Sequence, residues 1–198
     1  MRVIGGTARG ARLQSPKGTE VRPMLDRVKE ALFNILSDRL PDADVLDLFS
    51  GTGSLGIEAL SRGAKHAVFV ESDRRCADCI DQNLGHTRFA ERARIIRCSV
   101  LRSVPALTKL GRRFDLVLVD PPYKMTGSTS AQKPLEAMLE RAAQEDLFSA
   151  DAVLMIHHGR RMFAVSPPLP FEIFDERWYG QSGLAFLRMR SRENDVGA

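Results

Sequence analysis

The chain has 198 residues, of which 43% are hydrophobic and 27% charged, a composition typical of a single folded domain and not of a disordered chain. No apolar run approaches the ~20 residues of a membrane helix, and the opening MRVIGGTARG lacks the apolar part of a secretory signal, so a cytoplasmic protein is expected. The formal net charge is +4, and this whole excess lies in the first thirty residues, where seven basic side chains stand against three acidic ones.

Residues 1–23 are expected to form a basic N-terminal arm. The segment is rich in Gly, Arg and Thr and contains Pro16 and Pro23, which favours short extended pieces and turns. Positive charge confined to one segment is typical of an arm that neutralises nucleic-acid phosphates. A solvated tail that only aids solubility is the alternative interpretation.

A leading helix is predicted over residues 24–40, where apolar side chains recur at helical spacing and Pro41 ends the pattern. The apolar positions of this helix are Leu25, Val28, Leu32, Ile35 and Leu36.

Residues 44–190 alternate strands with helices and form the predicted core of one domain spanning 1–198. Helices are predicted from the glycine-rich segment to Arg62, to about Leu84 and over 134–147, with a flexible loop at 124–133 and a frayed tail at 191–198. The strands are predicted at 45–49, 67–71, 93–98, 114–120, 152–157, 171–178 and 184–190. This alternation predicts an α/β fold, a Rossmann-like seven-stranded, mostly parallel sheet with helices on both faces. The last two strands are joined only by YGQSG, so a hairpin with one antiparallel strand is expected near the C-terminus.

The three cysteines do not indicate a disulfide framework or a zinc site. Cys76 and Cys79 form a CxxC inside a predicted helix, without a second ligand pair at zinc spacing. We therefore expect reduced thiols and no metal.

A glycine-rich turn follows the first predicted strand. Gly51, Gly53 and Gly56 permit a tight turn and the close approach of a ligand to a helix N-terminus. The same spacing occurs in nicotinamide-binding proteins, as does an acidic residue such as Glu71 at the end of the second strand. Asp47, before the glycines, would repel a pyrophosphate and attract the ammonium of S-adenosylmethionine. The pattern therefore favours S-adenosylmethionine as cofactor, with a nicotinamide dehydrogenase as the alternative.

The fourth predicted strand ends in Asp120-Pro121-Pro122-Tyr123. Asp120 and the Pro121 carbonyl can accept N–H hydrogen bonds from an exocyclic amine and aim its lone pair at a methyl group. The prolines fix the backbone, and Tyr123 offers a ring on which an extruded base can stack. An ordinary strand-end turn is the alternative, since Asp-Pro and Pro-Pro are common in turns.

These residues resemble the amino-methyltransferases marked by (Asp/Asn/Ser)-Pro-Pro-(Tyr/Phe), and within them the bacterial RsmD-type 16S rRNA guanine-N2 methyltransferases. The resemblance extends over RVIGGTARGARL (2–13), VRPMLDRVKEALFNIL (21–36), LDLFSGTGSLGIEALSRGA (46–64), VFVESD (68–73), FDLVLVDPPY (114–123) and GQSGLAFLR (180–188).

The resemblance implies roles for named residues. Asp47, Phe49, Gly51, Gly53 and Gly56 would contact the methionine part of the cofactor and Glu71 its ribose. Ser72, Ser99 and Val100 would border the adenine. The RNA-facing residues would be Arg9, Arg12, Arg22, Asp26, Arg27 and Lys29. The implied partner is 16S rRNA, in a small ribosomal subunit or assembly intermediate, and a monomer is expected.

Three positions depart from the family pattern. Met24-Leu25 replaces a common Thr-Thr, Ser99 replaces Asp or Asn, and His157-His158 replaces a carboxylate at the end of the fifth strand. We interpret the histidines as a capped strand end.

Other functions remain open from sequence alone. An adenine-N6 methyltransferase would use the same Asp-Pro-Pro-Tyr chemistry. A protein-glutamine methyltransferase more often has Asn in the place of Asp120, and a non-catalytic RNA-binding module would not need the motif.

Overall fold

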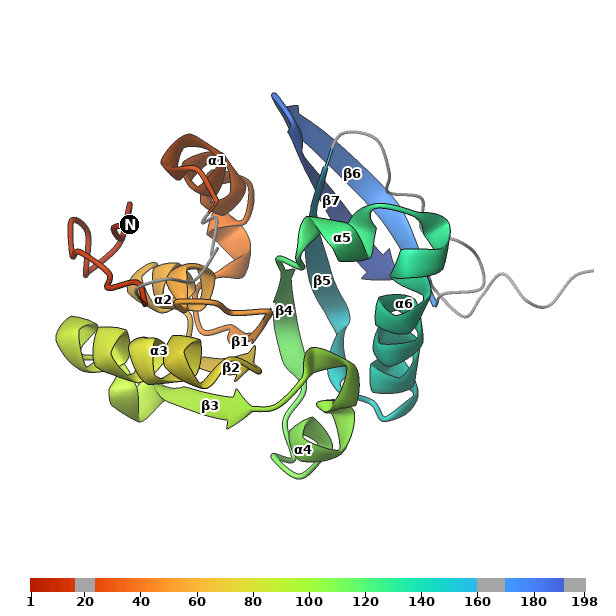
Figure 1. Cartoon of the computed structure of the whole chain (residues 1–198), viewed down its shortest axis with the longest axis horizontal. Helices are drawn as coiled ribbons and strands as arrows, with labels where there is room; N and C mark the ends of the chain where they lie inside the picture. Colours follow the sequence, from red (N-terminus) through yellow and green to blue (C-terminus); the bar gives the residue numbers. More distant parts are fainter. Residues whose placement is uncertain (17–23, 160–169, 191–198) are drawn as a thin grey trace, which may run out of the picture.

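The computed structural model describes residues 1–16, 24–159 and 170–190, which form a seven-stranded sheet in the order β3-β2-β1-β4-β5-β7-β6 (Figure 1). The strands are β1 (Asp44–Leu48), β2 (His66–Glu71), β3 (Ala93–Arg97), β4 (Phe114–Val119), β5 (Phe148–Gly159), β6 (Phe171–Tyr179) and β7 (Ser182–Met189). The pairs from β3 to β5 are parallel, whereas β7 runs antiparallel to both β5 and β6. The expected α/β sheet with an antiparallel strand near the C-terminus is confirmed.

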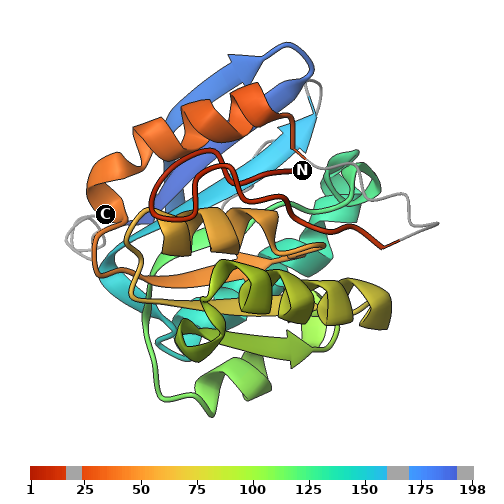
Figure 2. The same cartoon turned by 90° about the vertical axis from the view of Figure 1, so that its left-hand side faces the viewer.

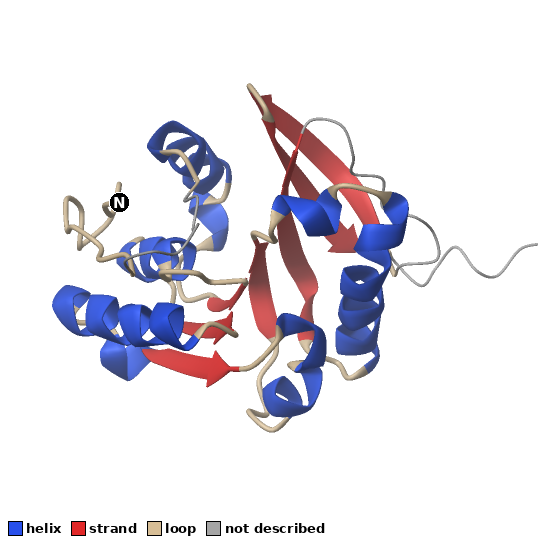
Figure 3. Ribbon diagram, viewed as in Figure 1, coloured by secondary structure: helices blue, strands red, loops and turns tan. Residues whose placement is uncertain are grey.

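Helices cover both faces of the sheet (Figures 1 and 3). One face carries α1 (Asp26–Ile35), α2 (Ser54–Ser61) and α3 (Arg74–Thr87), and the other carries α4 (Val104–Thr108), α5 (Tyr123–Thr126) and α6 (Thr129–Gln144). Short 3-10 turns lie at Ser37–Arg39, Ala90–Arg92 and Val100–Arg102. None of the helices in the described segments is both long and apolar enough to cross a membrane.

The two faces of β4 belong to two separate apolar clusters. Leu116 and Leu118 pack with the cluster under α1 to α3, and Val117 and Val119 pack with the cluster under α6. All four side chains are fully buried. This double burial explains the unbroken apolar run of the strand, which periodicity alone cannot distinguish from a buried helix.

The first sixteen residues lie across α2 and α3 (Figure 2). Arg2 and Arg12 form an antiparallel bridge, so the arm folds back on itself. Its attachment to α3 is polar, since the Gln14 amide donates to Oδ1 of Asn83 at 2.7 Å and Nδ2 of Asn83 donates to the Gln14 carbonyl at 3.1 Å. The predicted extended pieces and turns are therefore fastened to the core.

Several predicted boundaries were wrong. Residues 124–133 were expected to be a loop, but α5 and the first turn of α6 occupy them, and the Ser128 side chain caps α6 by accepting from the Ala131 amide. The leading helix ends at Ile35 and not at Leu40, strand β5 begins at Phe148, and α4 was not predicted. The predicted frayed tail, 191–198, lies outside the described residues.

Candidate active site

The neighbouring parallel strands β3, β2, β1 and β4 all end at the same edge of the sheet, here called the carboxyl edge. The predicted polar site residues lie at these strand ends. Val119 on β4 pairs with Ile156 on β5, and Leu48 on β1 pairs with Val119. The amide of Asp120 donates to the Leu48 carbonyl at 3.3 Å, which joins the end of β4 to the end of β1. Ligands of open parallel sheets bind beyond this edge.

Asp47 is a buried carboxylate with unsatisfied acceptor capacity. Its Oδ2 accepts from the Gly56 amide at 2.9 Å, and Oδ1 has no hydrogen-bond partner among the described residues. Burial raises the pKa of Asp47 to about 8, and the negative charges of Asp120 and Glu71 add to the rise. A cation placed beside Oδ1 would stabilise the ionised form, so the position suits a positively charged group.

The glycine-rich turn joins β1 to α2 and is held by a side chain from the neighbouring strand β2. Gly51 and Gly53 have positive φ angles of 54° and 78°, and Gly53 precedes the first residue of α2. The Gly51 amide donates to Oε2 of Glu71 at 2.8 Å. Phe49 also has a positive φ, 60°, a conformation that costs a non-glycine residue roughly 1–2 kcal/mol.

Gly56 is required by close packing. A Cβ atom at this position would lie 2.3 Å from Cε1 of Phe69 and 3.0 Å from Oδ2 of Asp47. The absence of a side chain therefore lets the first turn of α2 approach β1 and β2.

The end of β2 holds Glu71, whose Oε1 also accepts from the Asp73 amide at 2.8 Å. Ser72 follows on the surface. On the neighbouring strand β3, Arg97 pairs with Glu71, so Ser99 and Val100 lie just beyond the same edge. Ser99 is exposed and Val100 is buried.

The predicted catalytic motif lies between β4 and α5. Pro121 is buried, Pro122 is exposed, and the Pro122 carbonyl accepts from the Met125 amide at 2.8 Å. Tyr123 opens α5, and its side chain lies outside the described residues. The motif thus turns directly from the carboxyl edge into a helix.

His157 contacts Asp120, which the sequence interpretation missed. Its Nδ1 lies 2.6 Å from Oδ1 of Asp120, and the two side chains are 8% and 25% exposed. The interpretation of His157 as a strand cap was therefore wrong. The β4–β5 register brings the two residues together, since Asp120 and His157 follow the Val119–Ile156 pair, and the sequence alone does not give this register.

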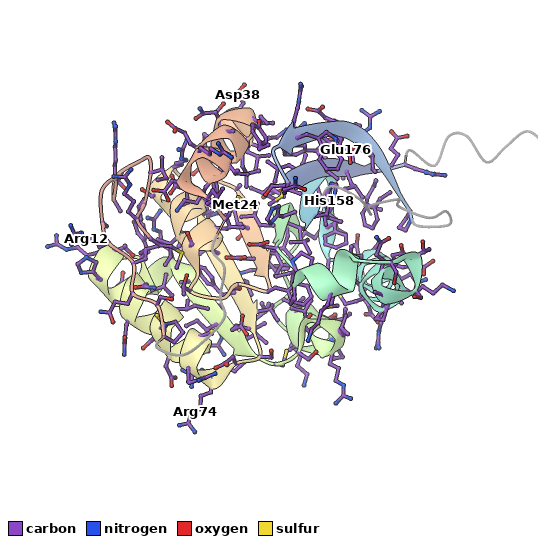
Figure 4. The ribbon with its side chains drawn as sticks, turned by 45° about the horizontal axis from the view of Figure 1, so that its top comes forward. Arg12, Met24, Asp38, Arg74, His158 and Glu176 are labelled. Carbon is purple, nitrogen blue, oxygen red and sulfur yellow. The ribbon has the colours of Figure 1, made fainter. Side chains whose placement is uncertain are left out.

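His158 belongs to a different environment from His157. Its Nε2 lies 3.3 Å from Oε1 of Glu176, and its ring meets Trp178 edge-on with the ring centres 5.1 Å apart. Both His158 and Glu176 are labelled in Figure 4. A Cβ atom at Gly183 would lie 2.4 Å from the His158 ring, so this histidine fills the space over β7.

The predicted RNA-facing residues divide into exposed and buried positions. Arg9, Arg12 and Arg27 are exposed, and Arg12 projects outward in Figure 4. Asp26 accepts from Nε of Arg2 at 3.1 Å. The remaining predicted arginine, at position 22, lies outside the described residues.

Lys29 is not available to RNA, contrary to prediction. It is 1% exposed, and its Nζ donates to the Arg2 carbonyl at 2.7 Å and lies 3.6 Å from Oε2 of Glu58. Burial lowers the pKa of Lys29, and the charge of Glu58 opposes this shift. The side chain fastens the arm to α2 because its charge needs a buried partner.

Within the segments described, no three His, Cys, Asp or Glu side chains gather as a group that could hold a metal ion.

Comparisons with known proteins identify the family. The family model described as "Conserved hypothetical protein 95" matches residues 1–188. YlbH of Bacillus subtilis, provisionally named as an rRNA methyltransferase, is 32% identical over 190 residues, which is 96% of this chain and 100% of YlbH. The ribosomal RNA small subunit methyltransferase D of Escherichia coli K12 is 40% identical over 124 residues, 63% of this chain and 61% of that enzyme. The solved structure of E. coli YhhF, provisionally described as a methyltransferase, has a TM-score of 0.79 at 30% identity and covers 97% of this chain and 99% of its own.

The residues at the carboxyl edge fit the cofactor of such enzymes. S-Adenosylmethionine carries an ammonium and a sulfonium, and the unpartnered Oδ1 of Asp47 is a buried acceptor suited to positive charge. The chain belongs to the RsmD-type family of S-adenosylmethionine-dependent methyltransferases.

Proposed function

We propose that this protein transfers a methyl group to the exocyclic N2 amine of a guanine in 16S rRNA. The observation that carries the proposal is the position of Asp120, which lies beyond β4 and near Asp47 of β1. One edge of the sheet thus holds a hydrogen-bond acceptor for the target amine and a carboxylate for the positively charged cofactor. The name of the E. coli relative, an rRNA small subunit methyltransferase, supports the substrate class.

The cofactor supplies an electrophilic methyl group on a positively charged sulfur. Asp47 would accept from the ammonium of its methionine part, and Glu71 from its ribose hydroxyls. Phe49, Gly51, Gly53 and Gly56 would line the methionine part, where Gly51 and Gly53 would let the backbone approach the ligand closely. Ser72, Ser99 and Val100 would border the adenine, at the ends of β2 and β3.

Asp120 and the Pro121 carbonyl would hold the target amine. The lone pair of an exocyclic amine is delocalised into its ring, and two N–H acceptors favour a pyramidal nitrogen whose lone pair points at the methyl group. Pro122 restricts the turn, and Tyr123 would stack on the extruded base. The nitrogen becomes acidic once methylated, so its proton leaves late, to Asp120 or to water.

The RNA would approach along the basic arm. The phosphates would be contacted by Arg9, Arg12, Arg22 and Arg27. A guanine in an unpaired loop would need little free energy to extrude into the site. The substrate would be rRNA in a small subunit or assembly intermediate, and the enzyme would act as a cytoplasmic monomer.

The test is identification of the methylated nucleoside. Small subunits that lack the modification are incubated with labelled cofactor and the protein, and the rRNA is then digested. We expect N2-methylguanosine. N6-methyladenosine, another labelled nucleoside, or no transfer to RNA would overturn the proposal.

The role of Asp120 is tested by Asp120→Ala, with Asp38→Ala as control because Asp38 is an exposed aspartate on the turn after α1. Asp120→Ala should lower turnover by about 10²- to 10³-fold, the size known for loss of one preorganised hydrogen-bonding group in an active site, while cofactor affinity changes less than about twofold by calorimetry. Full turnover in Asp120→Ala would remove Asp120 from the mechanism.

A further inference from the structure

We propose that His157 is a positioning residue that holds Asp120 as an ionised hydrogen-bond acceptor for the target amine. The inference rests on the proposed function of Asp120 and assigns a role to a histidine that the motif does not contain.

The geometry of the pair is that of a short hydrogen bond in a shielded place. Nδ1 of His157 lies 2.6 Å from Oδ1 of Asp120, and the imidazole is 8% exposed. An ionised carboxylate only accepts, so Nδ1 carries the hydrogen and donates it. With Oδ1 engaged by the imidazole, Oδ2 is the oxygen that turns to the substrate amine.

The backbone fixes this contact from both sides. The Asp120 amide donates to the Leu48 carbonyl at 3.3 Å, and His157 lies within β5, where it pairs with Leu184 of β7. Both residues continue strands that are paired in register up to Val119 and Ile156. The imidazole is thus held by a central strand, and it can therefore give the Asp120 carboxylate a fixed orientation.

The charges around Asp120 explain why a donor is needed. Asp47 on β1 and Glu71 on β2 bring further carboxylates to the same edge, where like charges repel one another. A hydrogen-bond donor on Oδ1 of Asp120 offsets this repulsion and leaves Oδ2 to accept from the target amine. On β5 itself the next residue is His158, which is paired with Glu176 of β6. His157 is the side-chain donor that contacts Asp120 among the described residues.

The first test compares variants that keep or lose the Nδ1 donor. The amide nitrogen of Asn can take the place of Nδ1, whereas that of Gln corresponds to Nε2. His157→Ala and His157→Gln should lower kcat about 10- to 100-fold, the size expected for a hydrogen bond to a charged group. His157→Asn should retain most of kcat, and KM for S-adenosylmethionine should change less than about twofold in all three. His158→Asn is the control, since His158 contacts the Gly159 carbonyl and Glu176.

The pH profile separates positioning from a merely structural role. Removal of a donor to a carboxylate raises the pKa of that carboxylate, so the acidic limb of the kcat profile should move to higher pH in His157→Ala and return toward the wild-type position in His157→Asn. Thermal unfolding of every variant identifies any that has lost its fold. Among variants of equal stability, the difference in kcat between His157→Asn and His157→Gln then shows whether a donor in the place of Nδ1 is needed. An unshifted acidic limb, or equal kcat for Asn and Gln, would overturn the proposal.

A double-variant cycle tests whether His157 acts through Asp120. In an Asp120→Asn background, His157→Ala should cause no further loss, because the carboxylate that it orients is gone. A full additional loss would contradict the proposal. Failure of the proposed function gives a different result: a labelled nucleoside other than N2-methylguanosine would refute the substrate, and an active Asp120→Ala would refute the role of Asp120. Failure of this inference alone leaves N2-methylguanosine as the product, Asp120→Ala inactive and His157→Ala at wild-type activity.

Discussion

Asp47, a residue of the proposed cofactor site, should couple cofactor binding to the stability of the fold. It is fully buried, its Oδ1 has no partner among the described residues, and its pKa is raised to about 8 by that burial. The folded protein therefore holds a proton on Asp47 at pH values where the unfolded chain, with a pKa near 3.8, has already lost it. The stability that this proton contributes is complete below about pH 4 and is lost as the pH rises through about 8.

We therefore expect the free energy of unfolding of the ligand-free protein to fall between pH 6 and 9 more steeply than that of Asp47→Asn. The amide oxygen of Asn can still accept from Gly56, but the side chain does not titrate. Urea unfolding across this range measures the difference. Saturating S-adenosylmethionine should flatten the slope of the natural protein, because its ammonium favours the ionised carboxylate. If the two proteins had equal slopes without ligand, the pKa of Asp47 would not be raised in the folded state.

At the scale of elements, the arm and α2 are joined by one buried carboxylate. Glu58 is fully buried and accepts from the Ile4 and Gly5 amides at 2.7 Å each, from Nε of Arg62 at 2.8 Å, and pairs with Lys29. This network fixes the basic arm against α2, the helix that follows the glycine-rich turn.

Glu58→Gln should lower the free energy of unfolding by about 3–5 kcal/mol, because it leaves the charge of Lys29 buried without its counter-ion. Amide hydrogen exchange at Ile4 and Gly5 should accelerate, since a neutral amide oxygen holds them more weakly than a carboxylate. Glu30→Gln is the control, since Glu30 lies exposed on α1. A loss below about 1 kcal/mol, as for surface pairs, would show that the network does not hold the arm.

The elements also show what the sequence could and could not predict. Seven strands were predicted near their true positions because runs such as FDLVLV are buried on both faces and carry a strong signal. Residues 124–133 were misread because the Ser and Thr residues that begin α6 and Pro134 within it resemble a loop in composition. Lys29 was misread because its partner Glu58 lies on another element, and charge patterns alone indicate exposure. The Asp120–His157 contact depends on strand order, which only the β4–β5 pairing reveals.

For the whole molecule, the asymmetry of charge is the feature that bears on RNA. The net excess lies in the first thirty residues, but the structure removes Lys29 from the surface and leaves Arg12 and Arg27 exposed. Arg27 also lies beside the β6–β7 turn, since a Cβ atom at Gly180 would be 3.6 Å from its Nη2. A phosphate-binding path would therefore lead from the arm over α1 toward the carboxyl edge.

The salt dependence of RNA binding tests this path. Each phosphate contact of a basic side chain contributes about 0.7–0.9 to the slope of log K against log salt concentration, so Arg12→Ala/Arg27→Ala should lower that slope by about twice this amount. Lys109→Ala/Arg113→Ala removes two exposed positive charges from the opposite end of β4 and should leave the slope unchanged. Binding is measured with a 16S rRNA fragment by fluorescence anisotropy at several salt concentrations, and cofactor affinity should stay within about twofold in both variants. If the two pairs lowered the slope equally, the attraction would belong to the net charge of the molecule, and the arm and α1 would have no special part in guiding RNA to the site.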